Sequence, residues 1–213
     1  MGFLDAAKSA IDAGVGMAGN AVGSVASAAN DFGVERMEFM RGLANLCTEG
    51  WKMGWHEANG GNVSYRLKTD DVEACRAAFK TDAAWVELGI TCPQMAGEFF
   101  AVTGTGKHLR LVESALAKSI GIVEVSPLGD SYRIVWGLSD GTAPTSELPS
   151  HILIHAVRAE ATDYHSRILY HAHPSNVVAL TMVLPGCART ITRALWGAMT
   201  ECIMLVPQGL GFV

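Results

Sequence analysis

Residues 119–138 read SIGIVEVSPLGDSYRIVWGL, and this stretch decides the class of fold. Two runs rich in β-branched and aromatic side chains flank Pro127, Gly129 and Asp130, which are typical turn residues. The pattern predicts a β-hairpin. In the second run every other residue from Tyr132 to Leu138 is apolar, as in a half-buried strand. Strands joined by a hairpin run antiparallel, so we expect a mixed rather than a purely parallel sheet.

The segments on either side of the hairpin alternate between helical and extended patterns. Helices are expected over 34–55, over 151–161 after Pro149, over 175–184 and over 193–200. Further strands are expected over 63–67, 98–103, 167–173 and 201–207. The chain is therefore predicted to adopt an α/β fold, and its 213 residues allow one domain plus a tail.

Composition excludes several classes of protein. Apolar residues make up 49% of the chain and charged residues 17%, which fits a buried core and not a disordered chain. A net charge of −5 without a basic stripe argues against a nucleic-acid binder. The five cysteines form no CxxC pair, and neither a secretory leader nor a confident membrane span is evident. Reduced thiols and a cytoplasmic location are the expectation.

Residues 1–33 differ in composition and residue pattern from the rest of the chain. Phe3, Ala7, Ile11 and Val15 form one apolar helical stripe, and small residues follow as in a flexible linker. Two interpretations stay open. The segment is either a solvated, flexible extension or an amphipathic peptide that docks on a protein partner.

His171-Ala172-His173 is the sharpest chemical feature. On a strand, residues i and i+2 point to the same face, so both imidazoles can reach one ion. Pro174 ends the strand there, and two neutral imidazoles suit zinc. The alternative is a hydrogen-bonded structural pair.

Polar groups of three other segments can hold an anion or move a proton. Thr145-Ser146-Glu147 stands before a helix, where hydroxyls and free amides bind anions and Glu147 can act as a general base. The alternative is plain helix capping. The glycine turns 59–62 (NGGN) and 103–107 (TGTGK) admit close backbone approach to a ligand, although either can be purely structural.

His151 and His155 are spaced i, i+4 on the predicted helix. The spacing can bind zinc, but the HExxH signature is not met because Ile152 follows His151. We expect packing or hydrogen-bonding roles for this pair.

Taken together, these motifs resemble the class II aldolases. The motifs, in their order along the chain, are Asn59–Asn62, Thr103–Lys107, Trp136-Gly-Leu, Pro144–Pro149, His171-Ala-His173, Leu195-Trp196 and Thr200-Glu201-Cys202. The resemblance covers 36–213, and the domain is taken to run over 34–213. It implies a three-layer α/β/α sandwich around a mixed, largely antiparallel sheet, assembled as a homotetramer.

The resemblance also implies a reaction and a site. The reaction is zinc-dependent retro-aldol cleavage of the sugar phosphate L-rhamnulose 1-phosphate to dihydroxyacetone phosphate and L-lactaldehyde, with one Zn²⁺ per subunit. His171 and His173 match metal ligands, Glu147 matches the catalytic acid/base, and Glu201 matches a carboxylate that enters the neighbouring subunit's site. The residues that match the phosphate-binding region are Asn59, Gly61, Asn62, Thr105, Gly106, Thr145 and Ser146.

One departure from the family pattern bears on activity. The third metal-binding histidine of the family lies in a later segment, and this sequence ends at Val213. A catalytic zinc normally has three protein ligands. We therefore expect that the C-terminal part of the domain is missing, that an apolar face is uncovered and that this form has little activity. Other class II aldolases, sugar-phosphate epimerases and a non-catalytic adducin-like domain remain the alternatives.

Overall fold

The computed structural model describes residues 33–199, 201–207 and 209. The expected extension over 1–33 therefore lies outside the described residues, apart from Gly33. The α-helices are α2 (Glu38–Lys52), α3 (Thr69–Cys75), α4 (Leu116–Ser119), α5 (Leu148–Ala161), α6 (Ser175–Val183), α7 (Ala188–Ala198) and α8 (Glu201–Leu205). Three short 3₁₀ turns are η1 (Arg76–Ala78), η2 (Pro93–Met95) and η3 (Leu109–Leu111). The strands are β1 (Asn62–Arg66), β2 (Val86–Glu87), β3 (Phe99–Thr103), β4 (Ile120–Val125), β5 (Ser131–Gly137) and β6 (Ile168–His171).

The six strands form one sheet in the order β2-β5-β4-β3-β1-β6. Every pair of neighbouring strands in this sheet is antiparallel. The predicted hairpin is confirmed as β4 and β5, and the expected largely antiparallel sheet is confirmed as well. Within the described residues the sheet contains no parallel pair. It is therefore purely antiparallel there, and not mixed as expected.

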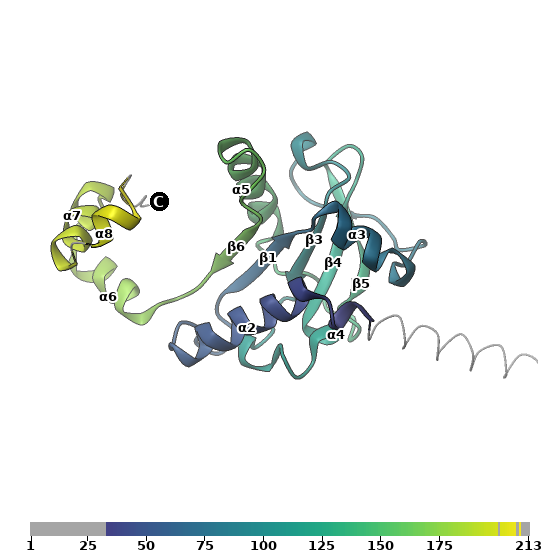
Figure 1. The fold of residues 1–213 in the computed structure, drawn as a ribbon, viewed down its shortest axis with the longest axis horizontal. Helices are drawn as coiled ribbons and strands as arrows, with labels where there is room; N and C mark the ends of the chain where they lie inside the picture. Colours follow the sequence, from purple (N-terminus) through teal and green to yellow (C-terminus); the bar gives the residue numbers. More distant parts are fainter. Residues whose placement is uncertain (1–32, 200, 208, 210–213) are drawn as a thin grey trace, which may run out of the picture.

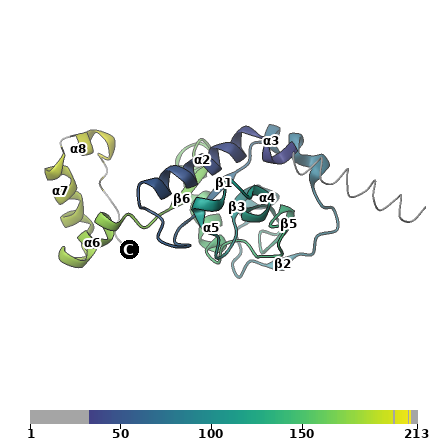
Figure 2. The ribbon, with the colours of Figure 1, turned by 90° about the horizontal axis from the view of Figure 1, so that it is seen from below.

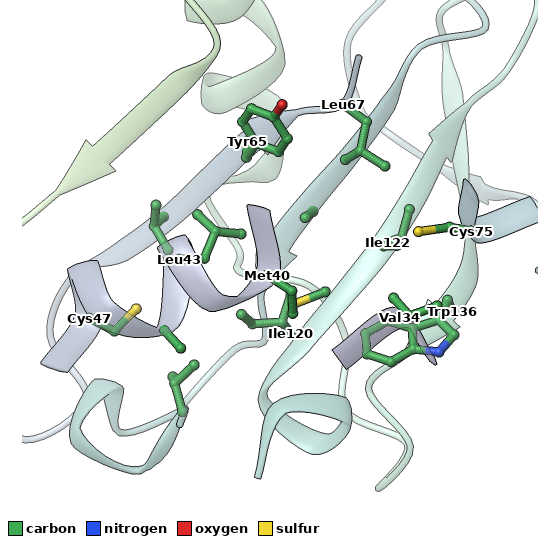
Figure 3. Close-up of a cluster of buried hydrophobic side chains, with 14 of the residues drawn as sticks. Val34, Met40, Leu43, Cys47, Tyr65, Leu67, Cys75, Ile120, Ile122 and Trp136 are labelled. Atoms are coloured by element: carbon green, nitrogen blue, oxygen red, sulfur yellow. The ribbon is translucent and has the colours of Figure 1, made fainter. Parts of the chain in front are cut away.

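Helices cover both faces of the sheet, as expected for the α/β/α sandwich. Figure 2 shows α2 and α3 on one side and α5 on the other. The α2 side buries Met40, Leu43 and Cys47 against β4 residues such as Ile120 and Ile122 (Figure 3). These α2 residues lie three and four positions apart, so they form one stripe that faces the sheet.

The alternation along β5 is broken by a β-bulge. Ile122 of β4 pairs with Trp136, whereas the next residue, Val123, pairs with Ile134, which leaves Val135 as the extra residue. An extra residue flips the side chains beyond it to the other face. Tyr132 and Ile134 accordingly pack on the α5 side, and Trp136 packs on the α2 side. The prediction that alternate residues of this strand share one half-buried face is therefore wrong beyond Ile134.

Helices α6, α7 and α8 lie apart from the sheet, beyond the end of β6 (Figure 1). The strand expected over 201–207 is wrong, because Glu201–Leu205 form helix α8. Short apolar runs suit a strand or a helix equally by pattern. Away from the sheet, a segment has no strand to pair with, and a helix satisfies its backbone groups within itself.

Candidate metal and acid/base site

The candidate site lies where β1 begins and β6 ends, at one edge of the sheet. Asn62 of β1 pairs with His171 of β6 in the antiparallel register. The turn before β1 must pass close to this pair. Gly61 has φ +82°, and a Cβ atom there would stand 2.5 Å from the carbonyl oxygen of His171. Only glycine fits that backbone without strain. The NGGN turn is thus shaped to lie against the end of β6.

The rings of His171 and His173 face each other across this edge. Their Nε2 atoms are 3.1 Å apart, and the ring planes are inclined at 65°. The backbone N–H of His173 donates to the carbonyl of Trp55 at 2.8 Å, which fixes the chain just past the strand. A Cβ atom on Gly60 would stand 2.7 Å from Nδ1 of His173, so the turn also supports the second ring. The two rings therefore meet as predicted, but β6 ends at His171, so the alternation of side chains along a strand does not explain the position of His173.

Glu147 approaches the other side of the His171 ring. Its Oε2 atom lies 2.8 Å from His171 Nδ1, and both side chains are partly exposed. A carboxylate only accepts hydrogen bonds, so this contact favours His171 with its proton on Nδ1. The Nε2 lone pair then faces His173 and is free to bind a metal. Glu147 thus lies next to the histidine pair, as predicted.

Behind Asn62 a chain of buried polar side chains leads into the protein. His151 Nε2 lies 2.6 Å from Asn62 Oδ1, and its Nδ1 lies 2.7 Å from Ser64 Oγ. Ser64 Oγ lies 2.8 Å from His155 Nε2. The hydrogen-bonding role expected for His151 and His155 is therefore confirmed. Their link through Ser64 was not foreseen, although Asn62 and Ser64 are two polar residues spaced i, i+2 on one strand.

Burial decides the protonation of these two histidines. Desolvation lowers the pKa of His151 to about 4, with a raising influence of Glu147 and a lowering one of His171. Desolvation lowers the pKa of His155 to about 3, helped by the charges of His151, Arg66 and Arg158. Both rings are neutral at pH 7.

His56 is a further residue that the sequence did not single out. Its Nε2 contacts the Tyr170 hydroxyl, and its Nδ1 lies 3.0 Å from the carbonyl oxygen of Gly60. Desolvation lowers the pKa of His56, and burial raises the pKa of Tyr170 to about 12. This pair joins β6 to the NGGN turn. No motif surrounds His56, so nothing in the sequence could have indicated this role.

The remaining phosphate-site candidates lie in two groups. Thr105, Thr145 and Ser146 line a hollow of about 260 Å³, held together because Thr105 N donates to Ala143 O and Thr145 N donates to Thr103 O. Asn59 is exposed in the turn before β1, and Asn62 is buried beside His171. The two asparagines are therefore not among the residues that line the hollow, contrary to the single pocket that the motifs implied. Gly106 has φ +67° and shapes the loop after β3.

Two links connect these groups. Ser146, in the hollow, precedes Glu147 directly. His108 Nδ1 lies 2.9 Å from the carbonyl oxygen of Ala58, which ties the loop after β3 to the NGGN turn. The hollow and the histidine pair are thus connected along the chain through Ser146 and Glu147, although Glu147 is not among the residues that line the hollow.

Glu201 begins α8 and is exposed, in the helices that lie apart from the sheet (Figure 1). The described residues hold no group of three or more His, Cys, Asp or Glu side chains that could close on one metal ion. No helix within 33–199 or 201–207 is both long enough and apolar enough to cross a membrane.

Known proteins resemble this chain over most of its length. It is 39% identical to the rhamnulose-1-phosphate aldolase of Enterobacter sp. (strain 638) and 38% identical to that of Klebsiella pneumoniae (strain 342). Each alignment covers 82% of this chain and 63% of the relative. The chain therefore spans less than two thirds of the length of these relatives.

A solved structure agrees with these relatives. The crystal structure of a sugar-phosphate aldolase from Thermotoga maritima matches with a TM-score of 0.63 and 26% identity, over 79% of this chain and 66% of that chain. The profile of the class II aldolase and adducin N-terminal domain matches residues 41–208. That span includes the histidine pair, Glu147 and both glycine turns. The chain accordingly belongs to the class II aldolase and adducin N-terminal domain family.

Proposed function

We propose that this chain provides the metal and acid/base centre of a cytoplasmic aldolase that cleaves L-rhamnulose 1-phosphate to dihydroxyacetone phosphate and L-lactaldehyde. The observation that carries the proposal is the approach of His171 Nε2 and His173 Nε2 to 3.1 Å, with Glu147 bonded to the far nitrogen of His171. Relatives named rhamnulose-1-phosphate aldolase support the choice of substrate.

The donor set fits two corners of a zinc site. Two imidazole nitrogens on a tetrahedral Zn²⁺ lie roughly 3.3 Å apart, given a Zn–N bond of about 2.0–2.1 Å. The observed separation of 3.1 Å is close to that value. When bound, one zinc ion per subunit would act as a Lewis acid that stabilises negative charge on the substrate oxygens. His171 and His173 would hold it, and the contact of Glu147 with His171 would orient the first ring.

Glu147 and Glu201 would move the protons of the cleavage. As the C3–C4 bond breaks, the C4 hydroxyl must lose a proton and C3 must gain one. We assign the transfer to C3 to Glu147, which would first take a proton from solvent, because its side chain stands beside the histidine pair and is 45% exposed. Glu201 would accept the hydroxyl proton in a neighbouring subunit of a homotetramer. Its exposed position on α8, apart from its own sheet, supports a role in trans.

The phosphate would anchor the substrate through a part that does not react. The residues Thr105, Thr145 and Ser146 line one hollow, and their hydroxyls would supply donors for phosphate oxygens. Asn59 and Asn62 would add amide donors from the turn before β1, where Gly61 keeps the backbone close. A sugar phosphate is short, so adjacent phosphate and metal positions are what the reaction requires.

Zinc content tests the metal part of the proposal. The purified chain should bind zinc and lose it to mild chelators, because only two imidazoles are offered by the described residues. His171→Ala should abolish zinc binding, whereas the matched exposed variant His165→Ala should leave it unchanged. Equal loss of zinc in both variants would show that the histidine pair is not the site.

Turnover tests the reaction. Cleavage of L-rhamnulose 1-phosphate is followed by coupled reduction of the dihydroxyacetone phosphate that is released. In a version extended to the full length of the relatives, Glu147→Gln should lower kcat by on the order of 10²- to 10⁴-fold without loss of zinc. Glu160→Gln, an exposed change on the same helix, should not alter kcat. In the same extended version, zinc loading without retro-aldol activity would favour an adducin-like, non-catalytic role, and turnover of another sugar phosphate alone would correct the substrate.

A further inference from the structure

The polar residues behind the site have no place in the chemistry described so far. His151 is 2% exposed and His155 is 1% exposed, and Ser64 between them is fully buried. Buried polar groups are costly unless every one is hydrogen-bonded, so a series of three on the path to Asn62 calls for an explanation.

The single proton of Ser64 restricts how this series can be arranged. Its Oγ lies between two ring nitrogens, His151 Nδ1 at 2.7 Å and His155 Nε2 at 2.8 Å. One hydroxyl can donate to only one of them, so the other ring must donate to Oγ. Both rings are neutral at pH 7, so each carries one proton. Only two directions of donation along the series are therefore possible.

In the first direction His155 Nε2–H donates to Ser64, and Ser64 donates to His151 Nδ1. His151 then carries its proton on Nε2 and donates to Asn62 Oδ1, 2.6 Å away. In the reverse direction His151 Nε2 accepts from the Asn62 amide, and the carbonyl oxygen of Asn62 turns toward the site. The two directions thus present opposite ends of the Asn62 amide to a ligand.

The charge of Glu147 selects between them. Its Oε2 atom accepts from His171 Nδ1 at 2.8 Å. Its charge also acts on His151, on the far side of Asn62, where it opposes the lowering of the pKa by desolvation. Glu147 therefore makes the electrostatic potential around Asn62 more negative. An amide carbonyl turned to the site is disfavoured by that potential, whereas an NH₂ group is attracted. The first direction therefore has the lower energy.

The NH₂ group of Asn62 also keeps hydrogen-bonding capacity for a ligand. Its Nδ2 atom is 3.4 Å from His171 Nδ1, which is beyond the range of a good N–H···N bond. That nitrogen of His171 already donates to Glu147. Asn62 is only 6% exposed, so an unused donor there stabilises an oxygen that enters the site.

We propose that His155, Ser64 and His151 form a one-way series of hydrogen bonds that holds the Asn62 NH₂ group toward the site, as a fixed donor to an oxygen atom of the substrate. The three are positioning residues, since none of them touches the histidine pair. The proposal deepens the proposed function and rests on it for the nature of the substrate. The orientation itself does not depend on catalysis.

Ring-¹⁵N spectra of the ¹⁵N-histidine-labelled full chain at pH 7 test the orientation directly. His151 should carry its proton on Nε2 alone, and the matching signal of His155 should also be Nε2–H. A proton on His151 Nδ1, a mixture of tautomers or an imidazolium would overturn the proposal. The measurement needs no variant and no activity, so it stands even if the chain cleaves nothing.

Variants test whether the series controls the amide. Ser64→Ala should turn the single His151 tautomer into a mixture, whereas the exposed matched change Ser114→Ala should leave it single. An unchanged tautomer in folded Ser64→Ala would remove Ser64 and His155 from the proposal. His155→Leu should repeat the effect of Ser64→Ala, and His155→Gln should restore the tautomer because glutamine keeps an N–H donor near the position of Nε2.

Ligand titration tests the role of the donor. Inorganic phosphate or dihydroxyacetone is added while the side-chain amide signals of Asn62 are recorded. A shift with phosphate assigns the donor to the phosphate end, and a shift with dihydroxyacetone alone assigns it to the hydroxyketone end. No shift with either would overturn the ligand-binding role. If turnover is present, His151→Leu should raise KM on the order of tenfold with less effect on kcat, and His151→Gln should restore it.

Discussion

Helices α2 and α6 are both rich in apolar residues, yet their surroundings are opposite. In α2 the apolar residues form one stripe, and Met40, Leu43 and Cys47 are buried against the sheet. In α6 the sequence SNVVALTMV is apolar around the helix, and none of its residues is buried. Met182 is 80% exposed there, whereas Met40 is fully buried. Helix α6 precedes residues 201–207, after which the uncovered apolar face was expected, so that expectation stays a prediction.

The difference teaches that apolar content alone does not place a helix in the core. A helix with apolar residues on one side can bury them against a single neighbouring element, and for α2 that element is the sheet. A helix that is apolar on several sides needs several neighbours, and the described residues do not supply them for α6. Exposed apolar surface of this kind normally becomes covered in an assembly.

The largest effect is expected from shortening a buried methionine. Met40→Ala should lower the free energy of unfolding by about 2–5 kcal/mol, because it leaves a cavity between α2 and the sheet. The matched change Met182→Ala in α6 should alter it by less than about 0.5 kcal/mol. Urea denaturation measures both. An equally large loss for Met182→Ala would mean that α6 is packed in solution, and the contrast between the helices would fail.

Acid should have the next largest effect on the sheet region when the change in stability is counted per pH unit. The pKa values of His151 and His155 are lowered in the folded state, to about 4 and about 3, so the unfolded chain binds protons first as the pH falls. Stability is then lost from about pH 6.5 downward, by up to about 1.4 kcal/mol per pH unit for each histidine.

Denaturant melts at several pH values measure this slope. His155→Gln should reduce it between pH 6.5 and pH 4, whereas the exposed change His165→Gln should not. The same slope in the wild type and in His155→Gln would mean that His155 is not buried in neutral form.

The smallest effect is expected at the N-terminus. Removal of residues 1–32 should change the melting temperature by less than about 2 °C, because their few large side chains can bury little apolar area. Calorimetry of the full and shortened chains checks this. A marked fall in melting temperature would add the segment to the core and would contradict the boundary drawn at residue 33.

Sequence patterns were sufficient where local rules decide the structure. The turn residues around Gly129 predicted the β4–β5 hairpin, and the i, i+2 spacing predicted that His171 and His173 meet, although β6 ends at His171. Patterns failed where the outcome depends on distant partners. The bulge at Val135 depends on how β4 and β5 pair, and residues 201–207 lack a neighbouring strand.

The candidate site was likewise visible only in part. Motifs indicated Glu147 and the histidine pair, because each has a recognisable spacing. Ser64 and His56 could not be identified, since their roles arise from contacts with residues about 90 and more than 100 positions away. Long-range contacts of single polar side chains produce no periodic pattern in a sequence.

The position of His173 gives the site a mechanical property. Only Pro174 separates it from the start of α6, so helices α6, α7 and α8 are attached to the sheet through the segment that carries the two candidate metal ligands. A pull on α6 would reach His173 first, and would act there on a single backbone bond to Trp55 before it loaded β6. A contact that immobilises α6, α7 and α8 would therefore also restrict the motion of the His173 imidazole. If these helices are mobile, the His173 imidazole is mobile with them.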